Sequence, residues 1–369
     1  MSKRLSVMLD VSAVPYGRGV SRYTSNLAAA LSNRLELDLT LFGYSWRQHD
    51  MLTQWSSEFG SQVKKSIWKI PPSVLEKSWR ATGFPSPVRG ADVFHAWESQ
   101  LPGTGIVPFV VTIHDLAHMM FPETAHPKVV ERYDYLLKRL EKDSRAQVIA
   151  VSHSGKQDIL NLTSLTPDRV HVVHEALPQE ARLVPAEQDL VQAHLDLGIK
   201  KPFLLFVGTT EPRKNLKTLI QAWKKVRKEF DLVIAGAKGW DDYTVEEGMH
   251  VLGYVSPMQL ACLYRLAHAL VFISLAEGFG LPILEAYFHG CPVITSRVSS
   301  MPEIGGKPAL YVDPYDVEGI AETFLALESK NTRARTQREK DMREVLDSFS
   351  WERAARETMN VYQLTAEAR

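Results

Sequence analysis

Two glutamates, Glu277 and Glu285, flank a glycine-bearing loop in the stretch SLAEGFGLPILEAYFHGCPVITS, residues 274–296. The glycines permit backbone conformations that other residues resist, and Pro282 suits the first turn of a helix, where its missing N–H costs nothing. A loop that runs from a strand into a helix presents backbone N–H groups and the positive end of the helix dipole, which together stabilise an anion such as a diphosphate. The carboxylates could then accept hydrogen bonds from sugar hydroxyls. The alternative, that both are solvated charges, fits the spacing equally well.

A second chemical feature is the pair of cations Arg213 and Lys214 in FVGTTEPRKNLKTLIQAW, residues 206–223. A strand is expected to end at Val207, Gly208 opens a loop, and a helix capped by the asparagine after Lys214 follows. Two cations at the carboxyl edge of a sheet suit a diphosphate, which arginine binds in a bidentate manner. Solvated charges are the alternative, but cations at a helix start oppose its dipole unless an anion is present, so a phosphate site is favoured.

The first half of the chain offers weaker signals. PYGRGVSRYTSNL, residues 15–27, is a glycine-containing loop before a helix, but it lacks the full G-x-G-x-x-G spacing of a dinucleotide site. VVTIHDLAH, residues 110–118, places His114 where a strand should end, as a polar contact for a substrate or as a structural hydrogen bonder. His114 and His118 have the i, i+4 spacing of a metal pair, but the strand context makes a metal site the less favoured interpretation.

A fold must position these features. Short apolar runs that alternate with longer amphipathic segments predict repeated βαβ units with parallel sheets. A polar, proline-flanked stretch at residues 178–200 interrupts the alternation and predicts a link between two units. We therefore expect two Rossmann-like, doubly wound α/β domains, residues 1–180 and 181–350. Residues 351–369 have the pattern of an amphipathic helix, which we expect to pack back on the first domain.

Composition limits the classes of protein to consider. The 369 residues carry 43 basic and 43 acidic side chains, so a nucleic-acid partner is not expected. Two cysteines and no Cys-x-x-Cys fit a reducing, cytoplasmic compartment rather than a disulfide framework. No run of about 18 apolar residues exists, so any membrane contact should be peripheral. Residues 64–90 mix basic side chains with tryptophans, which suits the inner membrane face or a lipid-diphosphate acceptor, although a surface loop with core tryptophans is somewhat favoured.

Taken together, the motifs resemble glycosyltransferase family 4, retaining enzymes of the GT-B fold, over nearly the whole chain. The family's pattern of two glutamates separated by seven residues matches AEGFGLPILEA. FVGTTEPRKN, VVTIHDL, QVIAVSHSGKQDI and the closing FSWERAA are similar to further family segments. The EPRKN and HDL forms are most similar to bacterial mannosyl- and rhamnosyltransferases that build the O-antigen of lipopolysaccharide or exopolysaccharide.

The resemblance implies a role for each candidate residue. Two domains would face each other across a cleft, with the nucleotide sugar held mainly by the second. Glu285 would bind the ribose hydroxyls, Glu277 would lie by the C3 hydroxyl of the donor sugar, and His114 would face the reacting sugar. Arg213 and Lys214 would neutralise the leaving diphosphate. The other expected contacts are the turn at Gly208, the loop backbone at Gly278, Phe279, Gly280 and Leu281, the base-side residues Tyr254 and Val255, and a phosphate or acceptor loop at Gly17, Arg18 and Gly19.

The implied activity is transfer of a hexose, with mannose favoured, from a nucleoside-diphosphate sugar such as GDP-mannose to a hydroxyl of a glycan or lipid-linked glycan in cell-surface polysaccharide synthesis. Same-face attack, assisted by the leaving phosphate, would retain the anomeric configuration, and neither a metal nor another cofactor is expected. A nucleotide-sugar 2-epimerase of the same fold and a catalytically silent nucleotide-binding module are the alternatives. An NAD-dependent oxidoreductase fits the alternating strands but lacks a dinucleotide fingerprint in either half.

Three positions depart from the family pattern. Thr209 stands where many members have arginine, so either Arg213 takes its place or the phosphate is held differently. Ser21 stands where a glycine is usual in the first loop, and its narrower backbone freedom weakens the case for the glycines before it. Ala176 replaces a glycine just before the expected link between the domains.

Overall fold

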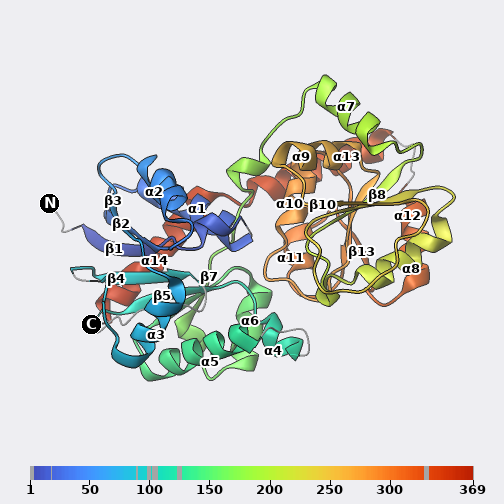
Figure 1. The fold of residues 1–369 in the computed structure, drawn as a ribbon. Coiled ribbons are helices and arrows are strands. Elements are labelled where there is room, and N and C mark those ends of the chain that lie inside the picture. Colours follow the sequence, from blue (N-terminus) through green and yellow to red (C-terminus); the bar gives the residue numbers. More distant parts are fainter. Residues whose placement is uncertain are drawn as a thin grey trace. The chain divides into compact units, whose positions relative to one another are not determined.

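The chain folds into two separate compact units in a computed structural model that describes residues 4–17, 19–88, 90–97, 101, 107–122, 127–327 and 332–368 (Figure 1). Unit 1 comprises Met1–Glu175 and Trp351–Arg369, and unit 2 comprises Ala176–Ser350. The division thus lies a few residues before the boundary expected after residue 180. The C-terminal helix belongs to unit 1, so that unit is assembled from two distant parts of the chain.

Unit 1 is built on a seven-stranded sheet in the order β3-β2-β1-β4-β5-β6-β7, and every neighbouring pair is parallel. Its strands are β1 (Leu5–Asp10), β2 (Leu37–Tyr44), β3 (Lys64–Trp68), β4 (Val93–Trp97), β5 (Phe109–Ile113), β6 (Gln147–Ala150) and β7 (Val170–Val172). Its α-helices are α1 (Gly19–Ser32), α2 (His49–Ser57), α3 (Pro72–Thr82), α4 (Ala117–Met120), α5 (Pro127–Lys142), α6 (His153–Leu162) and α14 (Trp351–Glu367). The central strands are buried on both faces and mostly apolar, as expected where helices cover a parallel sheet on both sides.

Unit 2 repeats this architecture with a six-stranded parallel sheet in the order β10-β9-β8-β11-β12-β13. Its strands are β8 (Phe203–Val207), β9 (Asp231–Ala235), β10 (Met249–Gly253), β11 (Ala269–Phe272), β12 (Val293–Ser296) and β13 (Leu310–Val312). Its α-helices are α7 (Glu187–Leu197), α8 (Leu216–Val226), α9 (Pro257–Leu266), α10 (Leu281–Phe288), α11 (Met301–Gly305), α12 (Val317–Ala326) and α13 (Thr332–Asp347). The predicted fold class, two doubly wound α/β units of the GT-B kind, is confirmed.

In each sheet, the direction in which the chain adds successive strands reverses once. In unit 1 the chain order reverses between β1 and β4, and in unit 2 between β8 and β11. At such a point the loops that leave neighbouring strands turn to opposite faces of the sheet and leave a crevice at the carboxyl ends, where open α/β sheets bind ligands. None of the helices in the described residues is both long and apolar enough to cross a bilayer.

A buried polar network ties the C-terminal helix to the sheet of unit 1. The Nδ1 atom of His95 on β4 lies 2.6 Å from the Tyr362 hydroxyl on α14, and its Nε2 atom lies 2.9 Å from the Thr112 hydroxyl on β5. The Tyr23 hydroxyl on α1 is 3.0 Å from the same threonine oxygen. Burial and the nearby His114 lower the pKa of His95 to about 3, so the ring is neutral near pH 7. A fully satisfied network of this kind fixes one packing of the helix.

Replacing Tyr362 by phenylalanine is expected to destabilise unit 1 by about 1–3 kcal/mol, because it leaves His95 Nδ1 buried without its partner. The measurement is urea unfolding of the full chain, with amide hydrogen exchange in β4 and β5 assigning the effect to unit 1. Leu364→Ala is the matched control, since Leu364 lies on the same helix but is half exposed. Equal exchange rates in the wild type and Tyr362→Phe would show that the network does not hold the helix.

Candidate active site

The residues of unit 2 that were expected to do chemistry meet at the carboxyl ends of β8 and β11. These strands are neighbours in the sheet, although β9 and β10 separate them in the chain. A 3₁₀ turn after β8 (Pro212–Lys214) carries the two cations, and the loop after β11 carries Glu277. Because both strands are parallel, their following loops emerge at the same edge, which places the cations beside the carboxylate.

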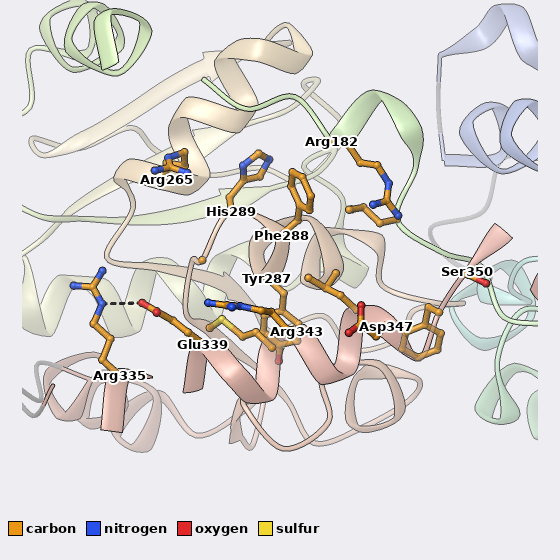
Figure 2. A pocket seen from close by; sticks show the side chains of 15 residues that line it. Arg182, Arg265, Tyr287, Phe288, His289, Arg335, Glu339, Arg343, Asp347 and Ser350 are labelled. Carbon is orange, nitrogen blue, oxygen red and sulfur yellow. Dashed lines mark hydrogen bonds and ion pairs between the residues drawn. The ribbon is translucent and has the colours of Figure 1, made fainter. Parts of the chain in front are cut away.

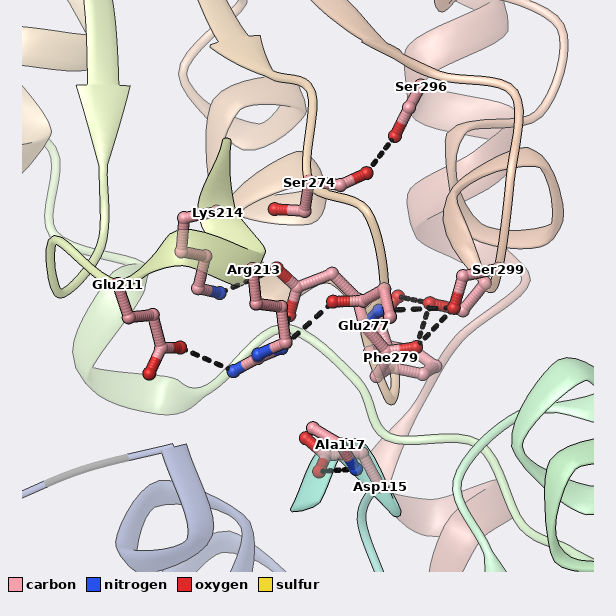
Figure 3. Close-up of polar contacts among 12 residues, drawn as sticks. Asp115, Ala117, Glu211, Arg213, Lys214, Ser274, Glu277, Phe279, Ser296 and Ser299 are labelled. Atoms are coloured by element: carbon pink, nitrogen blue, oxygen red, sulfur yellow. Dashed lines mark hydrogen bonds and ion pairs between the residues drawn. The ribbon is translucent and has the colours of Figure 1, made fainter. Parts of the chain in front are cut away.

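Glu277 is the centre of this site (Figure 3). Its Oε1 atom accepts a hydrogen bond from Lys214 Nζ at 2.6 Å, and its Oε2 atom accepts one from Arg213 Nη1 at 2.9 Å. Arg213 also donates to the Ala276 carbonyl at 2.9 Å and, through Nη2, to Glu211 Oε1 at 2.7 Å. The side chains of Glu277, Lys214 and Arg213 are 8, 13 and 16% exposed. The alternative of solvated surface charges is therefore wrong for all three.

The electrostatics of this cluster keep Glu277 ionised. Burial alone would raise the pKa of Glu277, but Lys214 and Arg213 outweigh burial and lower the pKa to about 2. With Glu211 included, the cluster holds two cations and two carboxylates and is close to neutral. A diphosphate that approached this edge would compete with Glu277 for the same two cations, since each can serve either anion.

The loop that carries Glu277 is held by two serines that precede α11. Ser299 donates to the Glu277 carbonyl at 2.8 Å and accepts from the Glu277 N–H at 3.1 Å. Ser300 donates to the carbonyls of Glu277 and Phe279 at 3.0 and 2.7 Å. Gly280, the N-cap residue just before α10, has a φ of 112°, a conformation that favours glycine. The loop is thus fixed before α10 starts, and Pro282 lies in the first turn as the sequence indicated.

Glu285 lies inside α10 rather than on the surface. It is 1% exposed, and its Oε2 atom accepts a hydrogen bond from the Tyr264 hydroxyl on α9 at 3.0 Å. The Tyr264 ring stacks on the ring of His289, with centroids 5.7 Å apart. Burying a carboxyl group is costly unless it is hydrogen-bonded, and Tyr264 supplies such a bond. Because Glu285 is buried, its interpretation as a solvated first-turn charge is wrong.

Two details of the β8 turn were not expected. Asn215 does not cap α8 through its side chain: its Nδ2 donates to the carbonyls of Ile273 and Pro314, and its Oδ1 accepts from Thr218. It therefore joins the turn to the end of β11 and to the segment after β13. Gly208 also has a close neighbour, because a Cβ on Gly236 would come within 2.1 Å of the Gly208 carbonyl. Glycine is required at residue 236 so that the two loops can approach.

The remaining donor-side candidates lie at the edge of the sheet and are at least partly exposed to solvent. Tyr254 is 81% exposed and Val255 partly exposed; both follow β10, which lies at the sheet edge with β9 between it and β8. Thr209 lies between Gly208 and the cationic turn, and its carbonyl accepts from the Glu211 N–H. Thr209 thus contributes a backbone contact to the turn that carries Arg213, and whether Arg213 takes the place of the usual arginine toward a phosphate stays a prediction. The assignment of these residues to donor contacts stays a prediction.

Unit 1 contributes the other candidates, which are described within that unit alone. His114 Nδ1 lies 3.0 Å from Glu175 Oε1, and its ring packs edge-on against Tyr23 at 4.7 Å. His118 instead packs against the ring of Tyr133. The two histidines belong to no cluster of three metal-ligating side chains within the described residues. The expectation that these two histidines bind no metal and the role of His114 toward a sugar both stay predictions.

Ser21 was expected to restrict the first loop of unit 1, but it lies in the helix that follows that loop. Gly17 has a φ of 65°, Gly19 is the first residue of α1, and Arg18 lies outside the described residues. Ser21 does not restrict the loop: it lies within α1, its hydroxyl accepts from the Gly17 N–H at 3.3 Å, and it donates to the Val14 carbonyl. The Ser21 hydroxyl thus joins the first turn of α1 to the loop before it.

Sequence inspection missed three residues of the site. Glu211 orients Arg213, Ser299 holds the Glu277 backbone, and Tyr264 contacts Glu285. A signal for Glu211 was present, because an acid two residues before an arginine in a tight turn is within reach of it. Nothing local could have identified Ser299 or Tyr264, which come from other elements of the unit.

Two known protein families match the sequence of this chain. Residues 17–180 match the family described as glycosyltransferase family 4, and residues 201–330 match glycosyl transferases group 1. The chain is 34% identical over 271 residues to an O-antigen chain mannosyltransferase B of Escherichia coli. That alignment covers 69% of this chain and 70% of the relative.

Solved structures share the fold at much lower sequence identity. Sucrose-phosphate synthase from Thermosynechococcus elongatus has a TM-score of 0.72 at 18% identity and covers 98% of both chains. Anabaena HepE in complex with UDP and glucose has a TM-score of 0.72 at 15% identity, covering 97% of this chain and 98% of its own. At such identities the likeness concerns the fold alone.

Glu277→Gln is expected to lower the free energy of unfolding of unit 2 at pH 7 by roughly 3 kcal/mol, because two buried cations lose their carboxylate. The folded-state pKa of about 2 lies below the ordinary 4.5, so the contribution is complete above pH 4.5 and is lost as the pH falls through 2. The difference between wild type and variant should therefore shrink in acid. Urea unfolding from pH 7 to pH 3 measures it, with exposed Glu229→Gln as control. A pH-independent difference would contradict this account.

Proposed function

This chain belongs to glycosyltransferase family 4, and on that basis we propose that it transfers a hexose from a nucleoside-diphosphate sugar to a hydroxyl of a glycan or lipid-linked glycan, with retention of the anomeric configuration. Similarity to an O-antigen mannosyltransferase favours mannose as the sugar and hence GDP-mannose as the donor. The product would be part of a cell-surface polysaccharide such as lipopolysaccharide, assembled on the cytoplasmic side of the membrane.

The proposal is carried by the pairing of Glu277 with Arg213 and Lys214 at the switch point of the unit 2 sheet. Departure of the sugar leaves negative charge on the diphosphate. Two cations and the amino end of α10 are available to stabilise that charge without a metal ion. Stabilisation that grows as the charge develops is what lowers the barrier.

Donor binding would exchange partners within this cluster. The diphosphate takes up the cations that Glu277 holds in the absence of ligand, and the carboxylate turns toward a hydroxyl of the donor sugar. Glu211 remains on Arg213 Nη2 and keeps the guanidinium oriented during the exchange. Glu285, fixed by Tyr264, would accept hydrogen bonds from the ribose hydroxyls.

Same-face attack accounts for retention. The acceptor oxygen forms a bond to the anomeric carbon while the bond from that carbon to the diphosphate oxygen breaks, and the acceptor proton passes to the diphosphate. The alternative, a covalent intermediate on Glu277, is disfavoured because a carboxylate with a pKa of about 2 and two cationic partners is a weak nucleophile. The contact between His114 and the reacting sugar is part of this proposal.

The test is a transfer assay on the full chain with GDP-mannose and other nucleotide sugars, with and without a lipid-linked mannosyl acceptor. We expect release of the nucleoside diphosphate that depends on the acceptor, a product that keeps the donor's anomeric configuration, and turnover that survives EDTA. Conversion of the nucleotide sugar without an acceptor would instead indicate an epimerase. Tight nucleotide binding with no turnover would indicate a silent module.

Lys214→Ala should lower the rate of transfer by about 10²–10³, or roughly 3–4 kcal/mol, since one transition-state contact is lost. Lys228→Ala is the control, because Lys228 is exposed and lies on the same unit away from the site. Circular dichroism establishes that both variants are folded. Near-normal turnover by folded Lys214→Ala would remove the cation from the mechanism.

We also propose a peripheral membrane contact through residues 64–90, made by the exposed side chains of this segment and not by its tryptophans. Trp79 is buried in the core and Trp68 packs against that core, as the favoured interpretation of core tryptophans expected, so neither ring is available to a membrane. Lys64 and Arg80 form ion pairs with Asp38 and Glu131. The exposed residues of the segment include Val74, Lys77 and Phe84.

We expect the wild type to float with anionic liposomes and Val74→Asp/Phe84→Asp to lose that binding, because two apolar contacts are replaced by charges that the surface repels. Leu35→Asp, an exposed site elsewhere in unit 1, serves as the control. Flotation of the double variant at the wild-type level would locate the contact elsewhere, and no flotation of any chain would exclude it.

A further inference from the structure

A polar cavity of about 760 Å³ lies in unit 2 at the carboxyl end of α10 (Figure 2). The loop that carries Glu277 is at the opposite, amino end of the same helix. The cavity is lined by the segment after Leu177, the end of α10 and one side of α13. Its volume falls in the range of about 300–1,000 Å³ that is common for small-molecule sites.

Arginine dominates the charged lining of this cavity. In Figure 2, Arg265 and Arg182 lie across the end of α10 from the charged side chains of α13, among which Glu339 is next to Arg335. The charged residues are Arg182, Arg265, Arg335, Arg343, Glu339 and Asp347. Arg335 is paired with Glu339 at 3.0 Å. Within the described residues, the other three guanidinium groups have no carboxylate at ion-pair distance, so the cavity carries excess positive charge although the whole chain is neutral.

Aromatic side chains give the cavity a second recognition surface. The Arg182 guanidinium lies over the ring of Phe288, 5.9 Å from its centroid. His289, which is 8% exposed, and Tyr287 lie beside it in the chain and also line the cavity. A stacked guanidinium keeps its edge N–H groups available for an anion while its face is covered.

We propose that this cavity binds a small, multiply charged phosphate-bearing ligand through Arg182, Arg265 and Arg343. Phosphate fits better than a single carboxylate because three separate guanidinium groups need several oxygens and more than one negative charge. The site is distinct from the one at Glu277, and its ligand would be bound as an effector or a second substrate group rather than as the leaving diphosphate.

The test is calorimetric titration of the full chain with inorganic pyrophosphate at low salt, for the wild type and for Arg265→Gln/Arg343→Gln. We expect the double variant to lose at least about tenfold in pyrophosphate affinity, because two charge-assisted contacts are removed. Lys340→Ala is the matched control, since Lys340 is on α13 but does not line the cavity. Hydrogen exchange should show added protection at residues 288–290 and 335–347 in the wild type only.

Nucleoside-diphosphate binding is measured on the same proteins and should be unchanged in the double variant, which separates this site from the proposed donor site. Hexose 6-phosphate and vesicles of phosphatidic acid then distinguish a free ligand from a lipid headgroup; arginine-dependent binding of either supports the proposal. Pyrophosphate affinity and protection that are the same in wild type and double variant, or no binding to the wild type at millimolar pyrophosphate, would overturn it.

Discussion

A buried carboxylate between two cations is the constraint on which the site of unit 2 depends. Removing an ion such as Glu277 from water is costly unless charged partners and hydrogen bonds receive it. The Lys214 ammonium and the Arg213 guanidinium must therefore reach it from a different loop, 2.6 and 2.9 Å away. Only the adjacency of β8 and β11 in the sheet allows this. The charge pairing at Glu277 therefore depends on the strand order of the sheet.

The same constraint explains which parts of the site are rigid. The serines before α11 hold the backbone on both sides of Glu277, and Asn215 joins the cationic turn to the end of β11. These contacts fix the backbone on which the charges are carried. In the exchange of partners that we propose, only side chains would therefore have to move.

Local sequence pattern predicted what is local in this molecule. Alternating apolar segments gave both parallel sheets, and the glycine and proline after β11 marked the start of α10. Local pattern could not predict contacts between residues that are distant in the sequence. Lys214 and Glu277 are 63 residues apart, and Tyr264 contacts Glu285 from another helix. The composition of residues 64–90 left two interpretations open for its tryptophans, and burial of Trp79 in the core supports the one that was favoured.

The split composition of unit 1 has a consequence for biosynthesis. Unit 2 is continuous in the chain, so it can close as soon as its last strand and helices have left the ribosome. Unit 1, although made first, lacks the helix that covers α1 and supplies the Tyr362 hydroxyl to His95 until translation has passed beyond Ser350. Unit 1 precedes unit 2 in the chain but is completed after it, and the part of its sheet that α14 covers stays exposed while the second unit folds.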